Sequence, residues 1–232
     1  LEARGCADLN GCGVCYGSAL TEANACQGHD VYIVGGANSA GQAAMYLSRF
    51  AKSVTLLVRG ADLSASMSYY LIQQINEAPN ISVRARTVVE TAHGSGRLEQ
   101  LTLRDVDTGE TELVDAQWMF VFIGAAPLAD WLDGTVLRDE HGFILAGPDL
   151  TADGRPPAAG GRDRPPFHRE TNIPGVVGAG DARAESAKRV ASAVGEGAMA
   201  VMLVHRCLEQ SGAGGSCRAA ARRSGRCSSS RS

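Results

Sequence analysis

The sequence predicts an α/β fold built on a parallel sheet, and three observations support that class. From Asp30 onward, short runs of β-branched residues alternate with segments in which apolar residues recur at helical spacing. The run Val31–Val34 predicts a buried strand, and a glycine-rich turn leads from it into a helix expected over Ser39–Phe50. A second buried strand is expected at Val54–Val58, which completes the strand, helix, strand order of a parallel sheet.

The next elements extend this pattern and then interrupt it. A second helix is expected over Ser66–Ile75, with Pro79 ending it because the residue before a proline avoids helical backbone. Residues 81–115 alternate around glycine turns, which predicts an inserted antiparallel β-meander. The apolar run Trp118–Gly124 then predicts another fully buried strand.

The last third of the chain is less regular. Residues 151–168 are rich in proline, glycine and arginine and predict a long mobile loop. One more strand is expected at Pro174–Asp181, followed by a long helix over Lys188–Glu209 with one apolar face. Residues 211–232 have no acid and too few apolar side chains to order themselves, so they predict a disordered basic tail.

Composition excludes several classes of protein. The chain has 232 residues with 44% hydrophobic residues and a formal net charge of -3, so we expect neither a nucleic-acid nor a membrane partner. No charged-then-apolar leader opens the chain, and Leu1 is not a methionine, so we expect a processed chain or a fragment. The chain has seven cysteines. An odd count in a chain this long argues against a secreted disulfide scaffold and indicates a reducing compartment, so we expect a cytoplasmic protein.

The turn between the first strand and helix carries a dinucleotide-binding pattern. Gly35 begins a G-x-G-x-x-G/A motif in which Ala37 replaces the second glycine and Ala40 fills the last position. In such a turn the glycines let the backbone approach a pyrophosphate that lies at the helix N-terminus. An ordinary glycine-rich turn is the alternative, and the position between a strand and a helix favours the dinucleotide.

The end of the second strand indicates which nicotinamide cofactor is used. NAD-binding proteins usually place an acid there for the ribose 2′-hydroxyl, whereas NADP requires a cation for the 2′-phosphate. Arg59 follows the strand, and no acid occurs before Asp62. We therefore predict NADPH, with Ser64 or Ser66 as further donors; the alternative is that Arg59 is an ordinary surface arginine.

Near the start of the chain, Cys12 and Cys15 stand three residues apart between glycines. A C-x-x-C pair lowers the pKa of one thiol and makes its disulfide exchangeable, so a redox dithiol is one interpretation. Zinc would need two further ligands, and the nearby Cys26 and His29 fit no common zinc-finger spacing, so we expect no metal. The third interpretation is a pair of structural thiols.

Several motifs together are similar to those of one protein family. The runs GCGVCYG, VGGANSAGQAAMYLS, VTLLVRG, FVFIGAAP, TNIPGVVGAGD and KRVASAVGEGAMAV resemble, in order and spacing, the low-molecular-weight thioredoxin reductases and their flavoprotein relatives. The resemblance implies a Rossmann-like NAD(P)-binding domain with the inserted β-meander, plus the C-terminal portion of an FAD-binding domain. The implied segments are a redox-motif segment at 1–28, the NAD(P)H domain at 29–130, the partial FAD domain at 131–210 and the tail at 211–232.

The resemblance also implies roles for individual residues. Asp181 would hold the FAD ribityl chain with Gly180 beside it, and Lys188 to Val190 match contacts of the flavin ring. The implied cofactor-binding residues are Gly35, Gly36, Ala37, Asn38, Ser39, Ala40, Arg59, Gly124, Gly180, Asp181, Lys188, Arg189 and Val190. The second arginine of the family's phosphate motif is Gly60 here, which departs from the pattern.

The resemblance implies a route for electrons. NADPH would reduce FAD, the flavin would reduce a Cys12–Cys15 disulfide, and Cys12 would then attack the disulfide of a thioredoxin-like protein or another acceptor. Tyr16 stands where the family has an acid. The chain lacks the family's N-terminal FAD-binding segment, so we expect a fragment of a longer homodimeric reductase rather than a chain that works by pairing with another chain or one that no longer binds flavin. The alternatives are a flavoprotein that reduces a ferredoxin-type carrier without these cysteines, or a non-catalytic NADPH-binding fragment.

Overall fold

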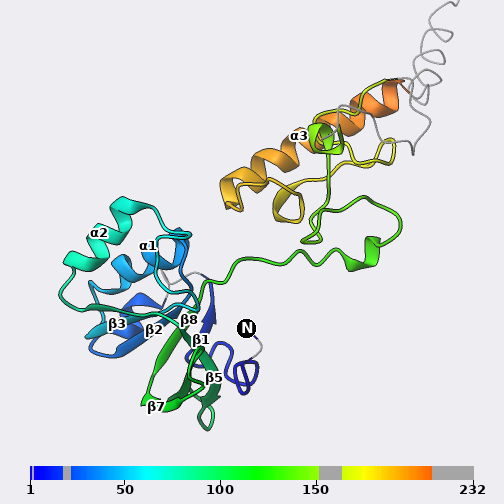
Figure 1. Ribbon diagram of the computed structural model, residues 1–232. Helices are drawn as coiled ribbons and strands as arrows, with labels where there is room; N and C mark the ends of the chain where they lie inside the picture. The colour runs from blue at the N-terminus through cyan, green and yellow to red at the C-terminus, as the bar shows by residue number, and fades with distance from the viewer. Residues whose placement is uncertain (2, 18–21, 152–163, 211–232) are drawn as a thin grey trace, which may run out of the picture. The chain divides into compact units, whose positions relative to one another are not determined.

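The computed structural model describes residues 1, 3–17, 22–151 and 164–210 (Figure 1). The chain divides into two compact units, Leu1–Gly124 and a second unit that begins at Ala125. Most of the expected loop at 151–168 and the whole expected tail at 211–232 lie outside the described residues.

A five-stranded parallel sheet forms the centre of the first unit. Its strands lie in the order β1-β8-β2-β3-β4, and every neighbouring pair is parallel. The strands are β1 (Val14–Tyr16), β2 (Asp30–Val34), β3 (Ser53–Leu57), β4 (Ile81–Arg84) and β8 (Trp118–Val121). The buried strands expected around residues 31–34, 54–58 and 118–124 are therefore confirmed, with β8 ending three residues earlier than expected.

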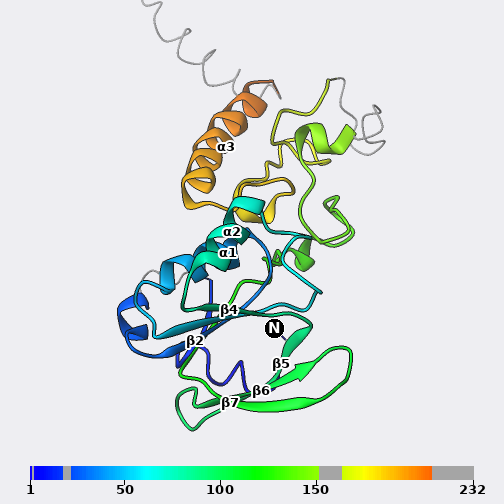
Figure 2. The same ribbon diagram turned by 60° about the vertical axis from the view of Figure 1, so that its left-hand side comes forward.

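Two helices cover one face of this sheet (Figures 1 and 2). They are α1 (Asn38–Leu47) and α2 (Tyr69–Glu77), and the short 3-10 helix η1 (Ala23–Cys26) adds Cys26 to the same core. Alanines on α1 are buried because small side chains let the helix approach the strands closely. Both helices expected from periodicity are thus present.

A three-stranded antiparallel sheet lies on the other face of the parallel sheet (Figure 2). Its strands are β5 (Thr87–His93), β6 (Gln100–Asp105) and β7 (Thr111–Asp115). Buried leucines of β6 pack with β2, β3 and β8 residues in a second core. The predicted β-meander is therefore confirmed over residues 87–115.

One predicted strand belongs to a different sheet. Residues 81–84 were expected within the antiparallel meander, but they form β4, which pairs in parallel with β3. The chain crosses from β3 through α2 and returns beside β3, as parallel connections require. A period-two pattern does not distinguish a parallel edge strand from a hairpin strand, because side chains alternate in both.

The second unit consists of loops, short 3-10 helices and one long helix. The short helices are η2 (Asp130–Leu132), η3 (Gly147–Thr151) and η4 (Gly180–Ala182), and the long helix is α3 (Val190–Gln210). The prediction of α3 is confirmed within two residues. The strand expected at 174–181 is wrong: within the described residues this segment makes only an isolated bridge at Val177, because no long neighbouring strand pairs with it.

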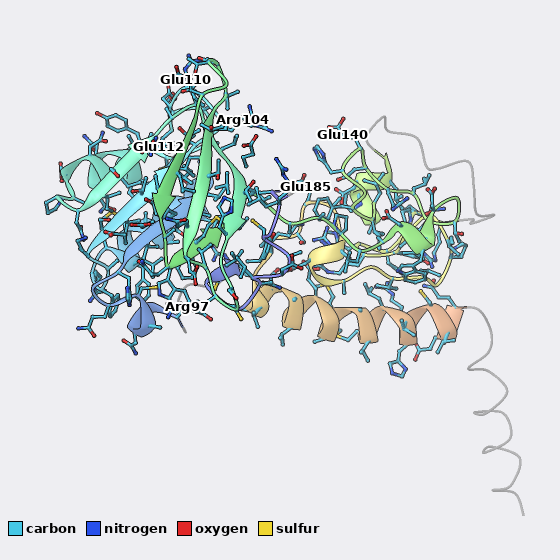
Figure 3. The ribbon with its side chains drawn as sticks, turned by 90° about the horizontal axis from the view of Figure 1, so that it is seen from below. Arg97, Arg104, Glu110, Glu112, Glu140 and Glu185 are labelled. Atoms are coloured by element: carbon cyan, nitrogen blue, oxygen red, sulfur yellow. The ribbon has the colours of Figure 1, made fainter. Side chains whose placement is uncertain are left out.

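The helix α3 leaves much of its apolar surface exposed. Val190, Val194, Val201 and Met202 are each more than half exposed, while Glu196 and Cys207 are buried on the other side of the helix. Figure 3 shows side chains projecting from α3 on the side away from the rest of its own unit. Within the part of the chain that the structure describes, no helix combines the length and apolarity needed to cross a membrane.

Candidate nucleotide-binding site and cysteines

The glycine-rich turn lies at the carboxyl end of the middle strand of the parallel sheet. The chain passes from β2 to β3 and β4 on one side and returns through β8 on the other side of β2. Such a reversal opens a crevice beyond the strand ends, where open α/β sheets bind their ligands. The predicted turn at Gly35–Ala40 therefore lies at the switch point between β2 and β8.

Backbone contacts in this crevice require a glycine at position 35. Gly35 has a φ of 146°, and a Cβ added there would lie 2.5 Å from the carbonyl oxygen of Phe122. The Phe122 amide in turn donates to the Val34 carbonyl at 2.8 Å. These contacts bring the segment that ends at Gly124 alongside the turn, so two of the predicted cofactor-binding segments do meet.

The N-terminus of α1 presents amide groups that no side chain caps. Ala37 occupies the N-cap position in extended backbone, without a side-chain hydrogen bond to the helix. Asn38 does not serve as a cap either, because its Oδ1 accepts hydrogen bonds from both the amide and the hydroxyl of Ser68, each at 2.8 Å. The first amides of α1, at Asn38, Ser39 and Ala40, therefore point to where a phosphate would bind.

The loop after β3 carries an exposed arginine, and its two serines form hydrogen bonds with other residues of the protein. Arg59 is exposed. Ser66 Oγ donates to the Gly36 carbonyl at 3.0 Å, and Ser64 donates through both its amide and its hydroxyl to Asp62. The hydrogen bonds from Ser64 lower the pKa of Asp62. The two serines proposed as phosphate donors therefore hold the loop in shape.

Sequence reasoning missed Arg86, which follows β4 and contacts the same loop. Its amide donates to the Gly60 carbonyl at 2.9 Å, and its side chain pairs with Asp107. Only the return of β4 beside β3 brings Arg86 next to Arg59, and no local sequence signal reveals that pairing.

The two cysteines of the C-x-x-C motif lie in different surroundings. Cys12 is exposed in the turn before β1 and lines a pocket of about 310 Å³ with Arg97, Gln117 and Trp118 among its other walls. Cys15 lies within β1, is partly buried and packs against the core beneath α1. Both thiols are free, so the structure does not join them.

Burial suppresses ionisation of the thiols near Cys15. Burial, and secondarily the charge of Glu22, raises the pKa of Cys15. Burial, followed by the charges of Cys15 and of Glu22, raises the pKa of Cys26 to about 12. Tyr16 also has a raised pKa because of burial, which makes it a weaker acid at neutral pH. These surroundings disfavour thiolates at Cys15 and Cys26.

The predicted flavin contacts of the second unit lie around η4 and the start of α3. Asp181 is exposed, as are Arg189 and Val190, whereas the Gly180 amide donates to Glu196 at 2.8 Å. Lys188 Nζ lies 3.9 Å from the centre of the Phe143 ring and donates to Ser186. The Asp181 side chain is therefore open to solvent, while Gly180 already uses its amide.

Glu196 organises this segment and was not predicted. It is buried, and its Oε1 lies 3.0 Å from Nη2 of Arg183, while its Oε2 lies 3.0 Å from Nη1 of Arg169. The hydrogen bonds from Arg183, together with the Gly180 amide, overcome the effect of burial and lower the pKa of Glu196 to about 2. The carboxylate therefore fixes η4 against α3.

Comparison with known proteins agrees with this arrangement. The family model described as pyridine nucleotide-disulphide oxidoreductase matches residues 7–197. The chain belongs to the pyridine nucleotide-disulphide oxidoreductase family. Within this family, the turn at Gly35 lies in the region that the model matches, as do η4 and the beginning of α3.

Individual relatives are named as thioredoxin reductases. The chain is 31% identical over 209 residues to one from Peptoclostridium litorale and 29% identical over 208 residues to one from Peptoclostridium acidaminophilum. These alignments cover 88% and 87% of this chain but 59% of each relative. The crystal structure of Lactococcus lactis thioredoxin reductase matches with a TM-score of 0.70 and 25% identity, over 90% of this chain and 62% of that one. The chain thus spans about three fifths of the length of these family members.

Proposed function

We propose that this chain is the pyridine-nucleotide part of a flavin-dependent oxidoreductase of the thioredoxin-reductase type, which takes its electrons from NADPH. The observation that carries the proposal is the Gly35 turn. A crowded glycine and an uncapped helix N-terminus lie at the switch point of a parallel sheet, and an arginine follows the neighbouring strand at the same edge. Membership of the family supports the use of a pyridine nucleotide.

Different residues of the chain would bind different parts of the two cofactors. The amides of Asn38, Ser39 and Ala40 would hold the pyrophosphate, with Gly35 and Gly36 allowing its close approach, and Arg59 would bind the 2′-phosphate. In the second unit, Asp181 would accept from the ribityl hydroxyls, and Gly180 with Lys188 to Val190 would border the flavin. FAD, when bound, supplies a hydride acceptor that passes electrons onward.

The first candidate for the acceptor is the disulfide of a thioredoxin-like protein. In this scheme a reduced Cys12–Cys15 pair would transfer two electrons, with the Cys12 thiolate attacking the partner's disulfide and Cys15 then displacing the partner's thiol. The names of the relatives support this candidate. We also propose a homodimer for the longer protein, as the resemblance of its motifs to the thioredoxin reductases implies.

A specific observation favours a second candidate, in which an electron carrier is reduced without these cysteines. Cys12 precedes β1 and so lies toward the amino edge of the parallel sheet, opposite the Gly35 turn. Cys15 packs into the core, where burial raises the pKa of its thiol. Both thiols are free in the structure.

The visible spectrum of the purified chain, recorded before and after adding NADPH, tests the proposal. A flavin band that NADPH bleaches is the expected result, and a protein that retains no flavin band after incubation with FAD and removal of the free FAD would reduce the proposal to a nucleotide-binding module. The Cys12→Ser and Cys15→Ser variants then separate the two acceptors. If both variants lose disulfide turnover, the dithiol is supported. If both variants keep flavin reduction and reduce an electron carrier at an unchanged rate, the second candidate is supported.

A further inference from the structure

We infer that Arg86 is the second cation of the 2′-phosphate subsite and takes the place that Gly60 leaves without a charge. This inference rests on the proposed function, because it concerns how the same crevice selects NADPH over NADH. It goes beyond the sequence motif, since Arg86 lies 27 positions after Arg59 in the chain.

Backbone hydrogen bonds fix Arg86 beside the loop that follows β3. The Arg86 amide donates to the Gly60 carbonyl at 2.9 Å, and the amide of Thr87 donates to the Val58 carbonyl at 3.0 Å. Two consecutive residues after β4 are thereby attached to the residues on either side of Arg59. An anion bound by Arg59 therefore lies within reach of the long Arg86 side chain.

The backbone conformation of Arg86 is unusual for an arginine. Its φ of 52° lies in the left-handed region, which costs energy for a residue with a side chain. Glycine or asparagine would adopt this conformation more readily. Keeping an arginine at a position that disfavours it is understandable when its guanidinium has a binding role.

The charge of Arg86 is held in place without being buried. Its guanidinium pairs with Asp107, and both side chains are about half exposed. An exposed ion pair of this kind contributes little to stability, so an incoming phosphate dianion can compete for the guanidinium at small cost. The acid thus positions the arginine in the absence of nucleotide and gives it up to the phosphate.

The available donors leave this subsite incomplete without Arg86. Gly60 provides no side chain, and the hydroxyls of Ser64 and Ser66 are already bonded to Asp62 and Gly36. Arg84, two residues earlier, pairs with Glu112 of β7, which lies in the sheet on the other face. Among the described side chains around this loop, Arg86 is therefore the best-placed partner for Arg59.

Calorimetric titration of the whole chain with NADPH and with NADH tests the inference. Arg86→Gln should weaken NADPH binding by about tenfold and leave NADH binding unchanged, because a charged hydrogen bond to the phosphate is lost. Asp107→Asn should strengthen NADPH binding by about threefold, because it removes the acid that competes with the phosphate. If the ion pair had only a structural role, the two substitutions would not change the NADPH affinity in opposite directions.

The matched control is Arg97→Gln, which removes the same charge at the far end of the antiparallel sheet. Figure 3 shows Arg97 at the end of this sheet opposite Glu110, a residue of the turn that contains Asp107. This control should leave both affinities unchanged. Equal weakening of NADPH and NADH by Arg86→Gln, or no change in either, would overturn the inference while leaving the proposed function intact. Failure of the unaltered chain to bind either nucleotide would overturn both.

Discussion

The first unit buries its apolar side chains in two cores on opposite faces of a parallel sheet, whereas the second unit buries two carboxylates among arginines and leaves much of α3 exposed. In the second unit Glu170 is fully buried and pairs with Arg164, and Glu196 pairs with Arg183. The fold of the first unit thus depends on many apolar contacts, each replaceable at moderate cost. That of the second also depends on a few buried charged contacts, and removing one partner of such a pair is strongly destabilising.

Replacing Glu196 should give the largest difference between the two units. Glu196→Ala leaves Arg183 and Arg169 without their buried partner, which should destabilise the second unit by about 3 kcal/mol or more. Hydrogen exchange followed by mass spectrometry should show faster exchange in peptides of the second unit and unchanged exchange in the first. The exposed Glu140 provides the control, since Glu140→Ala should change neither. Equal exchange in the Glu196→Ala variant and the unaltered chain would refute the role assigned to this ion pair.

Acid should affect the second unit through the same carboxylate. The folded pKa of Glu196 is about 2, below the ordinary value of 4.5, so its stabilisation is fully present above pH 4.5 and is lost as the pH falls toward 2. This difference corresponds to about 3 kcal/mol. Urea unfolding at a series of pH values should show a larger loss of stability in acid for the unaltered chain than for Glu196→Gln. A parallel loss in both proteins would assign the effect to other groups.

A substitution in the Gly35 turn should destabilise the first unit instead. Gly35→Ala places a methyl group against the Phe122 carbonyl, which should cost about 2 kcal/mol and greatly weaken NADPH binding. Thermal unfolding and calorimetry measure the two effects. Full NADPH affinity in this variant would show that close backbone approach at the turn is unnecessary.

A smaller change should stabilise the second unit. Gly195 lies within α3, and an added Cβ there meets no atom within 4 Å. Gly195→Ala should therefore gain up to about 1 kcal/mol from helix propensity. The midpoint of urea unfolding should rise, and a fall would mean that the open side of α3 at this position is covered in solution.

The sequence predicted the parts of the fold that local patterns determine. The strands β2, β3 and β8 and the helix α1 were recoverable because each buries a continuous or periodic apolar set. The sheet to which β4 belongs depends on a crossover between distant segments, which a single run of residues cannot encode. The strand expected at 174–181 failed for a related reason, because a strand requires neighbours that the local sequence does not provide.

The candidate site was predictable in a similar way. The Gly35 turn could be identified because its glycines and its place between strand and helix are both local. The contacts of Arg86 and Glu196 could not, because they arise where the chain returns to earlier residues. The spacing of Cys12 and Cys15 was visible, but not that β1 directs Cys15 into the core beneath α1.

Calorimetric titration of the chain with NADPH, with NADH as the comparison, tests the central claim most directly. A saturable heat of binding with NADPH and a weaker one with NADH is the predicted result, and NADPH binding should be greatly weakened in the Gly35→Ala variant. Absence of binding heat with both coenzymes would contradict the claim that the crevice between β2 and β8 is a pyridine-nucleotide site.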